Sequence, residues 1–395
     1  MKHLIFLLLF LTIVPAFCLA DSTDAPRLID TDGPTQGIQT LAVQELWRVG
    51  GLDGDLIFGR ITDVKMHPDG SVYILDNQLC QVVVISPEGE HLRNLSREGD
   101  GPGELRQPMG LVFLTDDMLG VGLGFPAKLV TLGLDGTPIA THYPVGAPAE
   151  GNVAVMISLH FQDGVLAASG GSIVFAPGAD SHTDRFLSVG DPSFGEFHRI
   201  LQRQTPIDPA GLQFVEADQY YFDRSWTLGP QGRIYAPMMR AAYEISEFDT
   251  AGNLVRVFGR KYTPRKRTGA EKELISPVIN TGTNDRSQWK IEDHDDCITR
   301  IMVDPADASV WVLTPHGHED QPDGILETWD VFSPTGEYLR QVAVPLGHEM
   351  VEGTCFLMGQ DRMVVIRGNQ SPRGDGEVED EAEAEPLEVI CYAIR

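Results

Sequence analysis

Positive charge is scarce in this sequence. Its 395 residues include 30 lysines and arginines against 57 aspartates and glutamates, so the formal net charge is −27 at pH 7. Proteins hold phosphate backbones with clustered lysine and arginine side chains. The composition therefore argues against nucleic acid as a partner and leaves divalent or cationic partners open.

Long apolar runs are scarce too. The longest predominantly apolar run, Leu4 to Val14, follows Lys2 and precedes the small-residue end Cys18-Leu19-Ala20. This pattern is typical of a secretory signal peptide, and the run is shorter than the roughly 18 apolar residues of a spanning helix. We therefore expect a signal peptide over residues 1–20, cleaved after about Ala20, a secreted or periplasmic protein, and no transmembrane segment. A lipid anchor on Cys18 is the alternative, which the bulky Phe17 disfavours.

Cysteine is rare after the signal peptide, where only Cys80, Cys297, Cys355 and Cys391 remain. Their spacing matches no metal finger. An oxidising compartment permits disulfides, so two states stay open: a Cys355–Cys391 bridge, or buried free thiols. Catalytic signatures are missing as well, because the sequence has no G-x-S-x-G nucleophile elbow and no H-E-x-x-H helix.

The sequence does contain many turns and short β-rich runs. Its 41 glycines and 26 prolines, with a hydrophobic share of 42%, favour an all-β architecture. Ile61 to Leu95 contains four such runs, with tight-turn sequences at His67-Pro68-Asp69-Gly70 and Ser86-Pro87-Glu88-Gly89. Four strands joined in this way form one blade of a β-propeller. Asp76 ends the second strand, and we expect its carboxylate to accept backbone N–H groups of the next turn.

The pattern returns with a period of about 40 to 50 residues. Further blades are predicted over Pro108 to His142, Val153 to Gln202, Phe222 to Phe258 and Cys297 to Val344. Val351 to Arg395 supplies only three strands, and Leu41 to Val49 is the missing fourth. The predicted fold is a six-bladed β-propeller, its ring closed by the N-terminal strand pairing with the three C-terminal strands. Residues 41–395 would form this single domain, after a flexible N-terminal segment at 21–40.

Two stretches carry a resemblance to a known family. Asp69 to Asp76 reads DGSVYILD, and Arg97 to Leu111 reads REGDGPGELRQPMGL. They resemble NHL-type six-bladed β-propellers, an exported bacterial family of unknown function. The resemblance extends as architecture over nearly the whole mature chain. It implies a fold and not an activity.

The long connections are predicted to share one face. In a propeller blade, the first-to-second and third-to-fourth turns lie on one face, and the other connections lie on the opposite face. The short turns belong to the first set, and the long segments to the second. These long segments are Ser96 to Gln107, Gly170 to Asp184, Arg203 to Tyr221, Arg260 to Asp296, Thr314 to Ile325 and Gly368 to Pro386. Because loops carry binding and catalysis more often than scaffold strands do, this loop-rich face is the predicted functional face.

Residues at the start of each innermost strand should ring the central channel at the loop-rich face. The predicted ligand-binding set is Arg60, Asn152, Arg224, Arg300 and Glu352. Three arginines in so acidic a chain suggest a pocket for a carboxylate or a sulfate, held by charge-assisted hydrogen bonds. The alternative is that they pair with neighbouring carboxylates such as Asp63, Asp223 or Glu352 and hold the blades together.

A second candidate site would bind a metal ion. His316 and His318 lie in the segment Thr314 to Gly324, and Asp293, His294 and Asp296 lie on the same predicted face. Imidazoles with nearby carboxylates bind zinc, and carboxylates alone suit calcium. Calcium or zinc would then be the cofactor, and no other cofactor is predicted. Because the spacing matches no established site, a solvated polar loop is the alternative.

Two charged runs stand out. Arg260 to Arg267, RKYTPRKR, is the only strongly basic run, and it would dock an acidic partner or lie against the chain's own acidic surface. Gly374 to Glu385, GDGEVEDEAEAE, is acidic and of low complexity, which predicts a disordered loop.

The sequence favours a binding function. The chain would be an exported binding or scaffold propeller that recognises a protein, a glycan or a small anion on its loop-rich face. The alternative is a metal-dependent hydrolase, lactonase or lyase with its site at the channel mouth, which needs several ligands converging from different inner strands. A third possibility is a subunit of a larger envelope assembly. Whether the protein is an enzyme stays open on the sequence alone.

Overall fold

The protein is described here from a computed structural model. The structure describes residues 25–52, 54–146, 152–174, 181–191, 193, 197–206, 214–275, 286–345, 353–358, 361–368 and 386–394. The predicted signal peptide, the acidic run Gly374 to Glu385 and Glu352 lie outside these residues. In the part of the chain that is described, no helix is long and apolar enough to cross a membrane.

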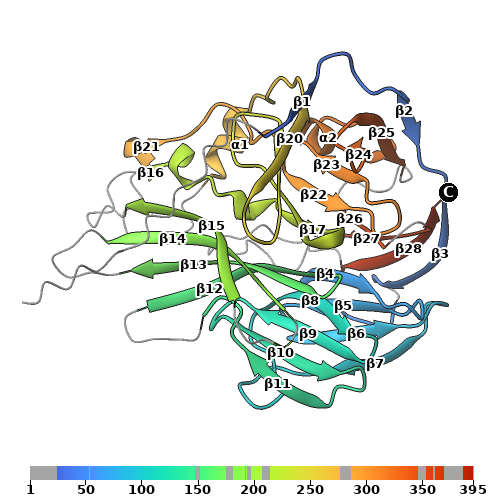
Figure 1. Cartoon of the computed structure of the whole chain (residues 1–395). Coiled ribbons are helices and arrows are strands. Elements are labelled where there is room, and N and C mark those ends of the chain that lie inside the picture. Colours follow the sequence, from blue (N-terminus) through green and yellow to red (C-terminus); the bar gives the residue numbers. More distant parts are fainter. Residues whose placement is uncertain are drawn as a thin grey trace, which may run out of the picture.

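Six antiparallel blades are arranged radially around a common centre, which confirms the predicted six-bladed β-propeller (Figure 1). Blade one is β4 (Ile61–Met66), β5 (Val72–Asp76), β6 (Gln81–Ile85) and β7 (His91–Leu95). Blade two is β8 (Pro108–Thr115), β9 (Met118–Leu123), β10 (Lys128–Gly133) and β11 (Pro138–His142). Blade three is β12 (Asn152–Gln162), β13 (Val165–Val174), β14 (His182–Gly190) and β15 (Phe197–Pro206).

The second half of the ring is built in the same order. Blade four is β17 (Thr227–Gly229), β18 (Arg233–Ala236), β19 (Glu244–Phe248) and β20 (Leu254–Arg260). Blade five is β22 (Arg300–Val303), β23 (Val310–Leu313), β24 (Ile325–Phe332) and β25 (Tyr338–Pro345). Blade six is β26 (Gly353–Leu357), β27 (Arg362–Arg367), β28 (Glu388–Ile394) and the N-terminal strand β3 (Val43–Gly50). In Figure 1 the innermost strands β4, β8, β17, β22 and β26 lie toward the centre.

The ring closes as predicted. Strand β3 pairs antiparallel with β28, with Val49 opposite Val389 and Trp47 opposite Cys391. The side chain of Trp47 is buried with Phe58 and Ile61 in the apolar cluster between blades six and one. Because strands from both ends of the chain complete blade six, unfolding either end exposes this core.

The N-terminal segment preceding β3 also forms strands. β1 (Arg27–Asp30) adds parallel to β20 at the outer edge of blade four, and β2 (Ile38–Thr40) adds parallel to β25 of blade five. The segment that the sequence analysis treats as flexible therefore contains two short strands. They cover two outer sheet edges that would otherwise be open to pairing with another chain.

Blade three is longer than predicted. Its strands have 9 to 11 residues, and Figure 1 shows β12 to β15 projecting beyond the other blades on one side. The predicted loop Gly170 to Asp184 is wrong at both ends, since β13 continues to Val174 and β14 begins at His182. Gly170 allows a close approach within the sheet, because a Cβ there would lie 2.9 Å from the backbone oxygen of Val155 on the paired strand β12.

The four described cysteines are buried free thiols. The predicted Cys355–Cys391 bridge is wrong because Cys355 lies in β26 and Cys391 in β28, with β27 between them. Burial raises the pKa of both thiols, which keeps them protonated and unreactive.

A buried carboxylate locks blade four to blade five. Asp330 of β24 accepts hydrogen bonds from the hydroxyl groups of Tyr243 (2.8 Å) and Tyr338 (2.7 Å), and from Nε of Arg260 (2.8 Å). The side chain of Gln341 donates a fourth bond, at 2.9 Å. Every oxygen of this buried charge is therefore satisfied, as burial of a charge requires.

Candidate functional site

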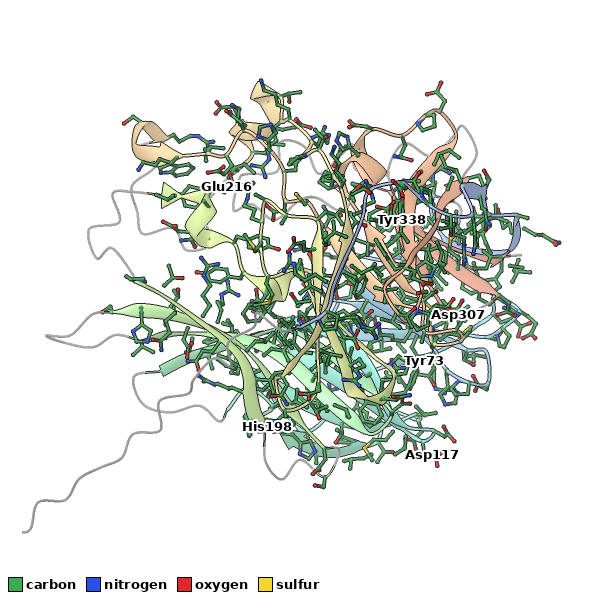
Figure 2. The ribbon with its side chains drawn as sticks, turned by 45° about the horizontal axis from the view of Figure 1, so that its top comes forward. Tyr73, Asp117, His198, Glu216, Asp307 and Tyr338 are labelled. Atoms are coloured by element: carbon green, nitrogen blue, oxygen red, sulfur yellow. The ribbon has the colours of Figure 1, made fainter. Side chains whose placement is uncertain are left out.

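The two faces of the disc differ in how their connections are built. Asp117 and Asp307 lie in short turns of blades two and five, whereas Glu216 lies in the long segment between blades three and four. Figure 2 shows Glu216 on the opposite side of the molecule from Asp117 and Asp307. The long segments after β15, β18, β20 and β23 contact one another through ion pairs, so they share the loop-rich face.

The centre of these contacts is a group of arginines. Arg267 pairs with Glu216 (2.7 Å) and Asp295 (2.6 Å), and Arg240 also pairs with Glu216 (3.1 Å). Arg265 pairs with Asp295 at 2.8 Å. Side chains from three separate connections are thus joined by charge-assisted hydrogen bonds.

Two alternatives for the basic run Arg260 to Arg267 were open, and the structure decides between them. Arg260 binds the buried Asp330 (2.8 Å), and Arg265 and Arg267 bind carboxylates of the chain's own loop-rich face. These three guanidinium groups are therefore engaged within the chain. A partner would have to displace ion pairs to reach them.

The predicted metal ligands are drawn to different partners. Asp293 pairs with Lys272 (2.7 Å) and Asp296 pairs with Arg240 (2.7 Å), while His294 holds Arg240 through its backbone carbonyl (2.6 Å). His316 bonds to Asp320 (2.6 Å) and to the carbonyl of Thr263 (3.1 Å). Within the described ranges, no group of three or more histidine, cysteine, aspartate or glutamate side chains lies close enough to hold a metal ion.

The residues predicted to ring the channel mouth are only partly placed there. Arg300 and Asn152 are the first residues of inner strands β22 and β12, and Arg60 directly precedes β4. Arg224 instead ends the short 3₁₀ helix Phe222–Arg224, three residues before β17, so it does not begin an inner strand. The backbone of Asn152 is described without its side chain, and the side chain of Arg224 also lies outside the described part.

Arg300 is held by blade five and blade six together. Its guanidinium lies 3.6 Å from the carboxylate of Glu327, donates to the carbonyl of Cys355, and stacks 4.8 Å over the ring of Trp329. Its Nε is buried and has no hydrogen-bond partner. Of the carboxylates expected as alternative partners, Glu352 lies outside the described residues, and the ion pair observed for Arg300 is with Glu327.

Glu327 is a functional candidate that the sequence analysis missed. Its side chain is 2% exposed, it accepts a hydrogen bond from the indole of Trp329 (2.9 Å), and it lies 3.6 Å from Nδ1 of His318. Its pairing with Glu327 raises the pKa of His318 above the ordinary value. The sequence feature that could have identified Glu327 is the alternation of side chains along β24, which places it on the same face as the buried Trp329 and Val331.

Arg60 is held through its backbone and not through its side chain. The buried carboxylate of Asp76 accepts hydrogen bonds from the backbone N–H groups of Gly59 (2.8 Å), Arg60 (3.1 Å) and Leu79 (3.0 Å). The structural role predicted for Asp76 is thereby confirmed. Among the arginine side chains that are described, only those of Arg60 and Arg340 take part in no hydrogen bond, ion pair or ring contact.

Exposed apolar side chains gather on connections of the loop-rich face. Ile57 is 80% exposed before β4, Leu79 is 42% exposed between β5 and β6, and Phe125 is 51% exposed between β9 and β10. Met239, between β18 and β19, is 59% exposed. Four connections from three blades thus each present an apolar side chain to solvent, which often marks an interaction surface.

A cleft of about 660 Å³ lies at the seam between blades six and one. Its lining includes Arg48, Leu56, Arg367 and Glu388. Three of its charged groups are paired, since Glu388 lies 3.6 Å from Arg48 and 3.3 Å from Arg367. The cleft runs along β3 at the outer side of the ring and does not include Arg60 or Arg300.

Comparison with known proteins shows the fold alone. No family model matches the sequence, and no curated protein matches it. Among solved structures, a member of the DUF4221 family from Bacteroides vulgatus is similar, with 12% identity, a TM-score of 0.51, and coverage of 90% of this chain and 98% of that chain. A calcium-binding protein, regucalcin, from Agrobacterium tumefaciens has 11% identity and a TM-score of 0.44, covering 91% of this chain and 96% of that one. Virginiamycin B lyase from Staphylococcus aureus has 10% identity and a TM-score of 0.43, covering 89% and 99%.

Proposed function

We propose that the protein is an exported binding propeller that recognises its ligand on the loop-rich face. The observation that carries this proposal is the set of apolar side chains on separate connections of that one face: Ile57, Leu79, Phe125 and Met239. Exposing them costs solvation free energy, which a ligand or partner would recover by covering them. Export, with cleavage after about Ala20, belongs to the same proposal.

The rest of the architecture suits a rigid recognition surface. On the loop-rich face, the connections around blades three to five are held by ion pairs such as Arg267–Glu216 (2.7 Å) and Arg265–Asp295 (2.8 Å). A surface that is already ordered loses little conformational entropy when it binds. The closed ring holds the presenting loops at fixed distances from one another.

The test is a ligand screen by thermal unfolding with matched variants. The face variant carries Phe125→Ser and Met239→Ser, and the control carries Leu92→Ser and Ile139→Ser, which are 46% and 53% exposed on outer strands β7 and β11. A ligand present at 100 times its Kd stabilises the native state by about 2.7 kcal/mol. We expect the rise in Tm to be reduced in the face variant and kept in the control. Equal rises in both variants would place the ligand elsewhere and refute the proposal.

One pair of residues favours the alternative function, a hydrolase, lactonase or lyase. His318 lies half-exposed on the loop-rich face, 3.6 Å from the buried carboxylate of Glu327. A carboxylate that orients a histidine is the arrangement used in general acid and base catalysis. Turnover that is lost on replacing His318 would establish this function, and the metal content of protein purified without chelator would show whether calcium or zinc takes part.

A further inference from the structure

We propose that Arg60 binds the anionic group of an amphipathic small molecule, a monocarboxylate with an apolar chain, at the part of the channel mouth beside blade one. This inference rests on the proposed binding function and names the class of ligand. The site consists of Arg60 and the exposed side chains of Ile57, Leu79 and Phe125.

The guanidinium group of Arg60 has no partner among the described residues. In a chain with 57 acidic and 30 basic residues, arginine side chains meet carboxylates readily, and the other arginines described on the loop-rich face have partners. The carboxylate of Asp76 accepts the backbone N–H of Arg60 itself, with those of Gly59 and Leu79. With no partner among the described residues, the Arg60 side chain offers the two parallel donors with which a guanidinium binds one carboxylate.

The site is also rigid. Asp76 ties the chain at Arg60 to the chain at Leu79, and the backbone N–H of Asn77 donates to the carbonyl of Arg60 at 2.7 Å. The side-chain amide of Asn77 donates to the carbonyl of Pro108 at 2.5 Å, which fixes this loop to the start of β8 in blade two. The loop that presents Arg60 is thus held by hydrogen bonds on both of its sides.

The surroundings of Arg60 are apolar. Ile57 lies three residues before Arg60, and Leu79 lies on the loop that Asp76 holds against it, with exposed fractions of 80% and 42%. Phe125 occupies the equivalent connection of the neighbouring blade two and is 51% exposed. A cation beside exposed aliphatic and aromatic surface matches a ligand with one charged end and an apolar body.

Charge decides between classes of anion. One free guanidinium neutralises one carboxylate, whereas a polyphosphate would need several cations. The net charge of −27 also repels ligands that carry more than one negative charge. A monocarboxylate with an apolar chain is therefore favoured over inorganic phosphate or a nucleotide.

The experiment measures the affinity of the full mature chain for four probes by calorimetry: octanoate, octanamide, acetate and inorganic phosphate. We expect octanoate to bind more tightly than the other three, because it alone supplies both the charge and the apolar chain. Arg60→Gln should weaken octanoate binding by about 10- to 100-fold, the loss typical of a charge-assisted hydrogen bond. Arg60→Lys should recover part of it, and Leu79→Ser should weaken octanoate binding without changing acetate binding.

Arg340→Gln is the matched control, because Arg340 also makes no side-chain hydrogen bond or ion pair within the described residues but lies on β25, the fourth strand of blade five. Equal affinities of the Arg60 and Arg340 variants for octanoate would overturn the proposal, and so would tighter binding of phosphate or octanamide. If octanoate fails while ligands from the screen still lose their effect in the Phe125→Ser, Met239→Ser variant, this inference is wrong and the binding function stands. If those ligands also keep their effect, the binding function itself is wrong. An unchanged Tm of each variant in the absence of ligand shows that its folding is intact.

Discussion

The closure of the ring predicts different costs for the same substitution at two equivalent glycines. Gly89 ends the β6–β7 turn of blade one with φ +92°, and Gly136 ends the β10–β11 turn of blade two with φ +88°. Each donates its N–H to the carbonyl three residues earlier, at 3.0 and 2.9 Å. Alanine at either position pays about 1–2 kcal/mol for a positive φ. Backbone strain therefore contributes equally to both variants.

The neighbours of the two glycines differ. A Cβ at Gly89 would lie 2.5 Å from Cβ of Trp47 on the closing strand β3, whereas a Cβ at Gly136 would lie 3.5 Å from the nearest atom, in Leu95. The first contact is a steric overlap and the second is ordinary van der Waals contact. Overpacking of a buried site costs about 1–3 kcal/mol. We expect Gly136→Ala to lower the free energy of unfolding by about 1–2 kcal/mol and Gly89→Ala by about 2–5 kcal/mol.

Urea unfolding of the mature chain, followed by tryptophan fluorescence, measures both variants against wild type. A double-mutant cycle isolates the overlap: in a Trp47→Gly background, Gly89→Ala should cost no more than Gly136→Ala does, because both the Cβ and the ring that it would meet are gone. If Gly89→Ala and Gly136→Ala are equally destabilising in the wild-type background, Trp47 does not lie over blade one. The closure of the ring by β3 would then be wrong.

Two further predictions concern charged and polar side chains. Because Glu327 raises the folded-state pKa of His318, this pair stabilises the fold fully below the ordinary histidine pKa of about 6.5 and loses its effect as pH rises through the raised value. His318→Gln should therefore lower the free energy of unfolding more at pH 5.5 than at pH 8.5. The difference should be less than about 1 kcal/mol, because the imidazole is partly exposed. Equal losses at the two pH values in urea titrations would contradict this. Tyr338→Phe removes one donor from the buried Asp330 and should lower the free energy of unfolding by about 1–3 kcal/mol. The same change at the exposed Tyr143 should have little effect and serves as the control. If Tyr338→Phe leaves the free energy of unfolding unchanged, the hydrogen bonds of Asp330 do not join blades four and five.

The sequence allowed the blades to be predicted because their turns are local. The two turns of blade one close within four residues, with Gly70 and Gly89 at positive φ, so the information lies in adjacent residues. The prediction of blades one and two agrees with the strands to the residue at their outer bounds. Blade three was less well predicted, since Gly170 and Gly171 read as a loop but lie inside β13, where close approach in the sheet favours glycine.

The site was harder to predict because its contacts are not local. Glu216 and Arg267 are 51 residues apart, and their pairing depends on two connections crossing the same face. Arg224 was placed at the channel mouth because blade four was taken to begin at Phe222, but β17 begins only at Thr227. Glu327 was not predicted, because its burial depends on how β24 packs in the blade and its neighbour His318 belongs to a separate segment.

The distribution of paired charge divides the loop-rich face into two parts. Over blades three to five, several arginines pair with nearby carboxylates, as in Arg185–Asp223 (3.2 Å) and Arg267–Glu216 (2.7 Å), so these ion pairs mainly hold the connections together. Beside blade one, hydrogen bonds to Asp76 fix the chain at Arg60 and at Leu79, and the guanidinium of Arg60 has no partner among the described residues. An anionic ligand that binds over blades three to five must break existing ion pairs. One that binds beside blade one can pair with the guanidinium of Arg60 and covers apolar surface. The free energy of binding is therefore expected to be most favourable beside blade one.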